Sequence, residues 1–169
     1  MKSPPSNEET SPMLSLGIDP GPVNTGLSVT SFSPSGSGVV LSTCLNFQGL
    51  SPFQVREKVL EICPHPDLLT IERFVSYRGV QSDSTERTGI IIGAIASIAH
   101  SVTLVRAVEW KFKIVQYISR QGFLNPSQSL DKKFSLAAAE FASGGKFKTD
   151  HEADSFLLSL YGYVFKKDY

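Results

Sequence analysis

Apolar residues recur along this chain with two different periods, and each period predicts a different kind of element. Short apolar runs bounded by turn residues predict strands at residues 13–19, 26–32, 39–47, 67–72 and 102–106. Longer segments predict helices at residues 52–63, 85–100, 109–119, 129–142 and 149–166. The first three strands follow one another as an antiparallel meander, and the later strands alternate with helices. This order predicts an α/β domain with a mixed five-stranded sheet flanked by helices.

Two of the predicted helices carry distinctive residues. Ser51 suits the N-cap of the first, Pro52 suits its first helical position, and Gln54 completes a capping box. The segment at residues 89–97 in the second is rich in glycine, alanine and serine. These small residues would permit close approach by another helix, at a dimer interface, or by the sheet itself.

Four polar residues interrupt the apolar pattern at the ends of predicted elements. Asp19 and Glu72 each end an apolar strand, where a buried carboxylate without a partner is costly. His151 and Asp154 lie three residues apart at the start of the last predicted helix, so they share a face. Two strand ends and one helix start can bring four ligands together around divalent metal ions, which points to a metal-dependent nuclease.

The same segments also allow purely structural explanations. Asp-Pro-Gly is a common turn signal, so Asp19 taken alone could simply cap a turn. Thr149 and Glu152 have capping-box spacing, and Asp150 in the first helical turn gains from the helix dipole. For His151 and Asp154 the structural alternative is a surface helix start with incidental charge, but both residues adjoin the apolar stripe of the helix rather than its opposite, wet face.

Length and composition fit one ordinary globular domain. The 169 residues suit a single core at residues 13–169, preceded by a polar, Pro-rich tail at residues 1–12 that we expect to be disordered. No apolar stretch reaches the length of a membrane span, and the N-terminus lacks a signal-peptide core. Cys44 and Cys63 have no metal spacing and are not expected to pair. We therefore expect a cytoplasmic protein that is not secreted.

Charge is balanced over the whole chain but not along it. The formal net charge is zero, which by itself argues weakly against nucleic-acid binding. Residues 101–149 nevertheless carry eight basic side chains against three acids. The basic residues are Arg106, Lys111, Lys113, Arg120, Lys132, Lys133, Lys146 and Lys148. A basic face beside an acidic cleft favours phosphodiester chemistry, and a solvated helical surface is the alternative.

Three motifs occur in order along the chain: Gly17-Ile18-Asp19-Pro20-Gly21-x-x-x-Thr25-Gly26, the strand-ending Glu72, and Asp150-His151-x-x-Asp154-Ser155. Together they resemble the motifs of the RuvC family of Holliday junction resolvases, which have the ribonuclease H-like fold. The resemblance covers about residues 14–161. It implies a homodimer that binds four-way DNA junctions and nicks two opposing strands symmetrically, in recombination or repair.

The resemblance also implies two Mg²⁺ or Mn²⁺ ions in each active site. Asp19 would bridge both ions, Glu72 would bind one, and His151 and Asp154 would bind the other. Asp150 is the second choice for the place of His151, because some relatives have Asp there. Carboxylates suit these hard ions, and an imidazole ligand tilts the preference toward Mn²⁺.

DNA contacts are implied in two places. The segment after Glu72 reaches the junction centre in RuvC-like resolvases, where Phe74 or Tyr77 could stack on an unpaired base, with Arg78 beside them. Phe74 could equally pack in the core. Two lysine pairs resemble the family's basic helix faces by position, namely Lys111 with Lys113 and Lys132 with Lys133.

Other functions fit some of the same residues. A nuclease of this fold could act on RNA or on non-junction DNA, and cleavage of junctions against linear duplexes would separate these possibilities. A non-cleaving junction-binding module is disfavoured, because acids near phosphate weaken binding unless metal is present. Sugar kinases and Hsp70-like ATPases share the strand–Asp–Gly turn, but they need two lobes and several hundred residues.

Overall fold

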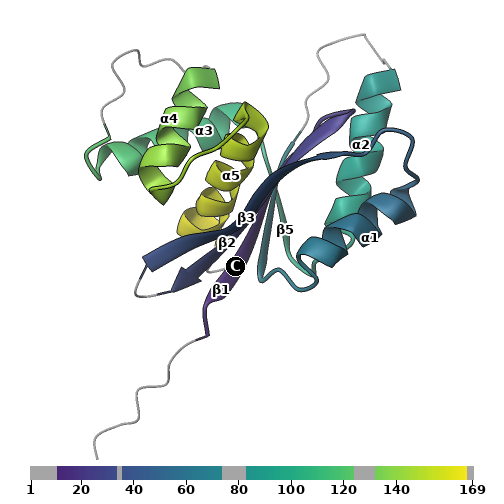
Figure 1. Cartoon of the computed structure of the whole chain (residues 1–169), viewed down its shortest axis with the longest axis horizontal. Helices are drawn as coiled ribbons and strands as arrows, with labels where there is room; N and C mark the ends of the chain where they lie inside the picture. The colour runs from purple at the N-terminus through teal and green to yellow at the C-terminus, as the bar shows by residue number, and fades with distance from the viewer. Residues whose placement is uncertain (1–10, 34–35, 74–82, 124–131, 167–169) are drawn as a thin grey trace, which may run out of the picture.

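A computed structural model describes residues 11–33, 36–73, 83–123 and 132–166 of the chain (Figure 1). Its centre is a five-stranded sheet with the strand order β3-β2-β1-β4-β5. The strands are β1 (Met13–Asp19), β2 (Asn24–Ser33), β3 (Gly36–Asn46), β4 (Leu68–Glu72) and β5 (Val102–Val105). The first three form an antiparallel meander, and β4 and β5 run parallel to β1. The predicted mixed sheet is therefore confirmed.

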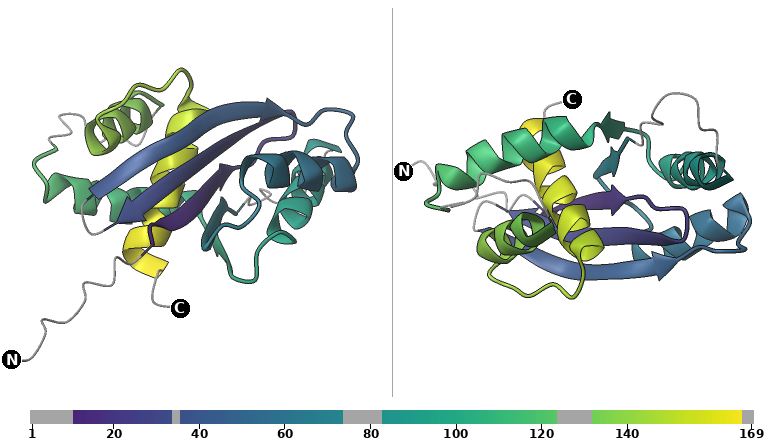
Figure 2. Two further views of the ribbon diagram at one scale, coloured as in Figure 1. Left: turned by 60° about the horizontal axis from the view of Figure 1, so that its bottom comes forward. Right: turned by 90° about the horizontal axis from the view of Figure 1, so that it is seen from above.

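Different helices cover the two faces of this sheet. These helices are α1 (Pro52–Ile62), α2 (Asp83–Ala96), α3 (Ala107–Ser119), α4 (Lys132–Ser143) and α5 (Asp150–Lys166). The long helix α5 crosses one face, with α3 and α4 packed against it, while α1 and α2 lie on the other face (Figures 1 and 2). We call these the α5 layer and the α1–α2 layer.

Local signals explain the start of α1 and the end of α2. The Ser51 hydroxyl accepts from the Gln54 backbone N–H, and the Gln54 side-chain oxygen accepts from the Ser51 backbone N–H, so the predicted capping box is present. The predicted helix at residues 85–100 ends earlier, at Ala96. The Ser97 hydroxyl donates to the Ala94 carbonyl at 2.7 Å, and such a side-chain bond competes with the regular helical ladder.

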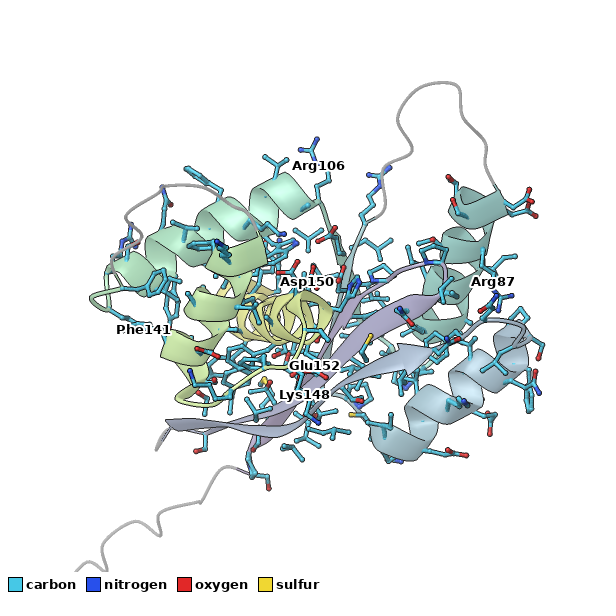
Figure 3. The ribbon with its side chains drawn as sticks, turned by 45° about the horizontal axis from the view of Figure 1, so that its top comes forward. Arg87, Arg106, Phe141, Lys148, Asp150 and Glu152 are labelled. Atoms are coloured by element: carbon cyan, nitrogen blue, oxygen red, sulfur yellow. The ribbon has the colours of Figure 1, made fainter. Side chains whose placement is uncertain are left out.

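The core of the α1–α2 layer is aliphatic and continuous with one face of the sheet. Leu16 and Ile18 of β1 are fully buried there, together with Val59 of α1 and Ile91 and Ile95 of α2. Arg87 of α2 donates hydrogen bonds to the carbonyls of Phe47 and Leu50, which lie in the loop between β3 and α1. In Figure 3 Arg87 lies toward the edge of the molecule, away from Asp150 at the start of α5. This layer therefore supports the strands by ordinary packing.

Two further expectations from the sequence concern cysteines and membranes. Cys44 on β3 and Cys63 at the end of α1 are free thiols, as predicted. None of the helices in the described ranges is both long enough and apolar enough to cross a membrane. Residues 1–10 of the predicted tail lie outside the described residues.

Candidate active site at the start of helix α5

Helix α5 lies against β1 with almost no side chains between them. Ser15 donates its hydroxyl to the Ser159 carbonyl at 2.9 Å, and a Cβ on Gly17 would collide with the Ser155 carbonyl. Ser15 thus lies against Ser159 and Gly17 against Ser155, so that moving two residues forward along β1 corresponds to moving four residues back along α5. The steps match because two strand residues rise about 6.6 Å and four helical residues about 6 Å.

This ladder ends in the first pair of candidate ligands. The next residue on the same face of β1 is Asp19, and its carboxylate Oδ2 lies 2.5 Å from Nδ1 of His151. Gly26, opposite Asp19 on β2, makes room for this contact, because a Cβ there would collide with the His151 carbonyl. The hydrogen bond that the Asp19 carboxylate accepts from His151 raises the pKa of His151, against the effect of burial. Asp19 and His151 therefore form one half of the site.

Glu72 stands at the end of β4, the strand parallel to β1. Its Oε2 accepts a hydrogen bond of 2.8 Å from the indole Nε1 of Trp110. Burial and then the charge of Asp19 raise the pKa of Glu72 to about 7, although Trp110 and Lys111 oppose this shift. The carboxyl group therefore keeps its proton to a much higher pH than an exposed glutamate does.

Asp154 lies one turn after His151 on α5. Its Oδ2 pairs with Lys111 Nζ at 3.0 Å, and both side chains are largely buried. Its other oxygen, Oδ1, is buried without a hydrogen-bond partner in the described part of the chain. Burial raises the pKa of Asp154, while Lys111 and the hydroxyl of Ser135 lower it. An orphaned carboxylate oxygen of this kind is costly unless a ligand completes it.

The donor atoms fit a divalent cation, although the side chains are not gathered around one. Across the described ranges, no three His, Cys, Asp or Glu side chains lie close enough together to hold an ion as they stand. Each of three proposed ligands already has one side-chain atom in a hydrogen bond within the protein: His151 with Asp19, Glu72 with Trp110, and Asp154 with Lys111. The orphaned Oδ1 of Asp154 and a set of three carboxylates and one imidazole suit Mg²⁺ or Mn²⁺.

The residues next to the proposed ligands have structural roles. The Thr149 hydroxyl accepts from the Glu152 backbone N–H at 3.1 Å, and the Glu152 carboxylate accepts from the Lys148 backbone N–H at 2.8 Å. Thr149 therefore caps α5 as the spacing predicts, but the return bond of the capping box goes to the Lys148 backbone instead of the Thr149 backbone. Asp150 is the first residue of α5, beside the strand ends (Figure 3), and its negative charge helps to raise the pKa of His151.

The predicted DNA-contacting residues are placed only in part. Phe74, Tyr77, Arg78 and the Lys132 side chain lie outside the described residues. Lys133 is exposed on α4. Lys111 and Lys113 do not act as a pair: Lys111 reaches Asp154, whereas Lys113 pairs with Glu109 at 3.3 Å and approaches the Tyr161 ring.

Trp110 is the site residue that sequence reasoning missed. Strand β5 pairs with β4 so that Val105 lies opposite Glu72, and α3 begins two residues later. The first turn of α3 therefore passes beside Glu72 and brings Trp110 and Lys111 to the carboxylates. The available signal was the short connection between a strand parallel to β4 and a helix carrying the chain's one tryptophan.

Comparison with solved structures identifies the fold. RuvC of Thermus thermophilus, solved in complex with a Holliday junction substrate, matches with a TM-score of 0.68 at 16% identity, over 92% of this chain and 96% of RuvC. A yeast mitochondrial Holliday junction resolvase matches with a TM-score of 0.52 at 14% identity, over 92% of this chain and 81% of the resolvase. No protein-family profile matches the sequence, and no curated protein does either. The chain therefore has the ribonuclease H-like fold of RuvC.

Proposed function

We propose that this chain is a metal-dependent endonuclease that cuts four-way DNA junctions by paired, symmetric nicks. The observation that carries the proposal is the meeting of Asp19 and His151 at 2.5 Å beside the buried carboxylates Glu72 and Asp154. Two of these groups stand at strand ends and two on the first turns of α5, in a fold shared with junction resolvases. Keeping three partly buried acids near one another is costly, and a bound cation would relieve that cost.

The four side chains have distinct tasks in this proposal. Asp19, Glu72, His151 and Asp154 would hold divalent ions, which when bound neutralise a phosphodiester and lower the pKa of an attacking water. Asp19 orients the His151 ring by its bond to Nδ1, which leaves Nε2 as the ligating nitrogen. Lys111 balances the charge of Asp154 while no cation is present. Asp150 remains the second choice as a ligand.

The substrate class follows from charge and from the shared fold. Lys133 is exposed on α4, in the same helical layer as the candidate site, where it would contact DNA phosphates. The aromatic wedge at the junction centre is assigned to Phe74 or Tyr77, beside Arg78. Free thiols at Cys44 and Cys63 are compatible with action in a reducing cytoplasm.

A homodimer would supply the second active site that paired nicking requires. The small residues Gly89 and Gly93 of α2 are exposed, and a Cβ on either would meet nothing within 4 Å. The neighbouring Ile90 is 38% exposed. This open face of α2 is our candidate for the dimer contact, and light scattering at working concentration should report a dimer.

The decisive experiment compares substrates under one set of conditions. The protein is incubated with Mg²⁺ or Mn²⁺ and a synthetic four-way junction, a linear duplex of the same arm sequence, or an RNA–DNA hybrid. We expect cleavage of the junction at symmetric positions on two opposing strands, and far slower cleavage of the other two. Preferential cleavage of the hybrid or the linear duplex would replace the junction proposal with another nuclease activity of the same fold. Binding without cleavage would indicate a junction-binding module.

A further inference from the structure

The chain has one tryptophan, and it lies both in the core of the α5 layer and beside the candidate site. Trp110 is fully buried at the inner side of α3, with Ile114 and Ile118 following it along the helix. Its indole Nε1 donates to Oε2 of Glu72 at 2.8 Å. A buried tryptophan usually finds some hydrogen-bond partner, and here that partner is one of the four proposed metal ligands.

We propose that Trp110 is a positioning residue that holds Glu72 ready for a divalent cation, and that its fluorescence reports occupation of that carboxylate. This inference rests on the metal-dependent function proposed above. An indole N–H is a donor only, so Trp110 cannot itself ligate the ion or compete for it. By engaging Oε2 it restricts the rotation of the Glu72 side chain and leaves Oε1 to be the ligating atom.

The architecture around Trp110 supports a role in positioning. Glu72 ends β4, and its three side-chain torsions would otherwise be fixed only by packing. Lys111, the next residue of α3, holds Asp154 in the same way at 3.0 Å. One turn of one helix therefore fixes one oxygen of each of two acids, Glu72 from the sheet and Asp154 from α5. Partners that orient metal ligands typically change metal affinity about 10- to 100-fold when they are removed.

The optical consequence follows from the position of the charge. Excitation moves electron density of indole away from its pyrrole ring, so a negative charge beside Nε1 stabilises the excited state. A cation bound to Glu72 offsets that charge and should shift the Trp110 emission to shorter wavelength. Since the chain has one tryptophan, the whole indole signal comes from this position. Mg²⁺ and Ca²⁺ are the suitable probes, because paramagnetic Mn²⁺ quenches fluorescence without needing the hydrogen bond.

The experiment combines fluorescence with titration calorimetry on the full chain. Wild type should give a saturable shift to shorter wavelength with Mg²⁺ or Ca²⁺, and the E72Q variant should show neither this shift nor tight binding. Trp110→Phe should bind Mg²⁺ about 10- to 100-fold more weakly by calorimetry. Tyr161→Phe is the matched control, because it also removes a donor from a buried aromatic ring, but one that bonds Glu109 outside the site at 3.0 Å. It should bind Mg²⁺ as wild type does.

The outcomes separate this inference from the function on which it rests. If wild type binds no divalent ion, the metal-dependent function itself is wrong. If E72Q binds the ion unchanged, Glu72 is not a ligand and the inference about Trp110 falls, while the other three proposed ligands stand. If wild type binds through Glu72 but Trp110→Phe binds equally tightly, only the role of Trp110 is wrong. Should Trp110→Phe fail to fold, replacing Trp110 with benzothienylalanine keeps the ring shape and removes the N–H. Wild-type affinity in that variant would overturn the inference, and a loss matching the predicted range would support it.

Discussion

The two faces of strand β1 are built from different kinds of residue, although they alternate along the same seven positions. Leu16 and Ile18 face the α1–α2 layer, where they are completely buried among aliphatic side chains. Ser15, Gly17 and Asp19 face α5, where hydroxyls and bare backbone replace side-chain packing. One face supplies cohesive burial, and the other supplies a close approach that ends at a carboxylate.

The glycines of the two layers show the same contrast. A Cβ added to Gly17, Gly26 or Gly162 would collide with backbone of α5 or with the Thr70 hydroxyl. A Cβ added to Gly89 or Gly93 of α2 would meet open space. The first group therefore makes the helix–sheet contact possible, whereas the second leaves a surface open. The structural role of a glycine in a helix or strand therefore depends on which atoms surround it.

The largest difference between the two faces of β1 should appear when one residue on each face is substituted. Asp19→Asn should lower cleavage about 1,000-fold or more, because several kcal/mol of charge stabilisation depend on the bound ions. Ile18→Val, one residue away on the other face, should cost about 1 kcal/mol of folding stability and leave cleavage largely intact. Junction cleavage and urea unfolding of both variants check this. Wild-type cleavage by Asp19→Asn would remove Asp19 from the site.

Alanine substitution at glycines of the two layers should have effects of opposite sign. Gly26→Ala should destabilise the protein by about 3 kcal/mol, since the added methyl meets backbone that cannot rotate away. Gly93→Ala should stabilise it by up to about 1 kcal/mol, because alanine is the better helix former and the space is open. Thermal or urea unfolding measures both. Equal effects at the two positions would contradict the difference between the layers.

The sheet and most helices follow from the sequence because periodicity and turn residues are local signals. The sequence also predicts that Asp19 and His151 lie near each other as ligands of the same ion, because Asp19 ends a strand and His151 begins a helix. What the sequence could not supply was the partner of each acid. Trp110 and Lys111 reach the site only because β5 pairs with β4 in one register and α3 then turns back. Such partners depend on long-range pairing, which a single sequence does not encode by spacing.

The pH dependence of the free energy of unfolding should show that the partly buried carboxyl group of Glu72 destabilises the folded protein when it is ionised. The pKa of Glu72 is raised from 4.5 to about 7, so the folded chain keeps a proton that the unfolded chain loses within this window. The free energy of unfolding without metal should therefore fall as pH rises from about 4.5 to 7, by up to about 1.4 kcal/mol per pH unit. The raised pKa of His151 and of Asp154 acts in the same direction.

Glu72→Gln should flatten this slope, and urea unfolding in the presence of a chelator measures it. The same change at Glu57, a half-exposed residue of α1, is the control and should leave the slope in place. Saturating Mg²⁺ should offset the fall in wild type, because metal binding favours the ionised carboxylates. Identical slopes in wild type and Glu72→Gln would mean that this carboxyl group carries no such cost.

The smallest expected effect concerns DNA binding by the surface of the α5 layer. Lys133 is exposed on α4, and Lys58 is also exposed, on α1 in the opposite layer. If the α5 layer faces the DNA, Lys133→Glu should weaken junction binding and reduce its salt dependence by about one unit of slope per lost phosphate contact. Lys58→Glu makes the same change of charge and should leave the slope unaltered, while neither variant should lose more than about 0.5 kcal/mol of stability.

Binding of a fluorescent junction over a range of salt concentrations separates the two cases. An equal loss for both lysines would mean that long-range charge alone attracts the DNA, and an unchanged slope for Lys133→Glu would make that lysine part of a solvated surface.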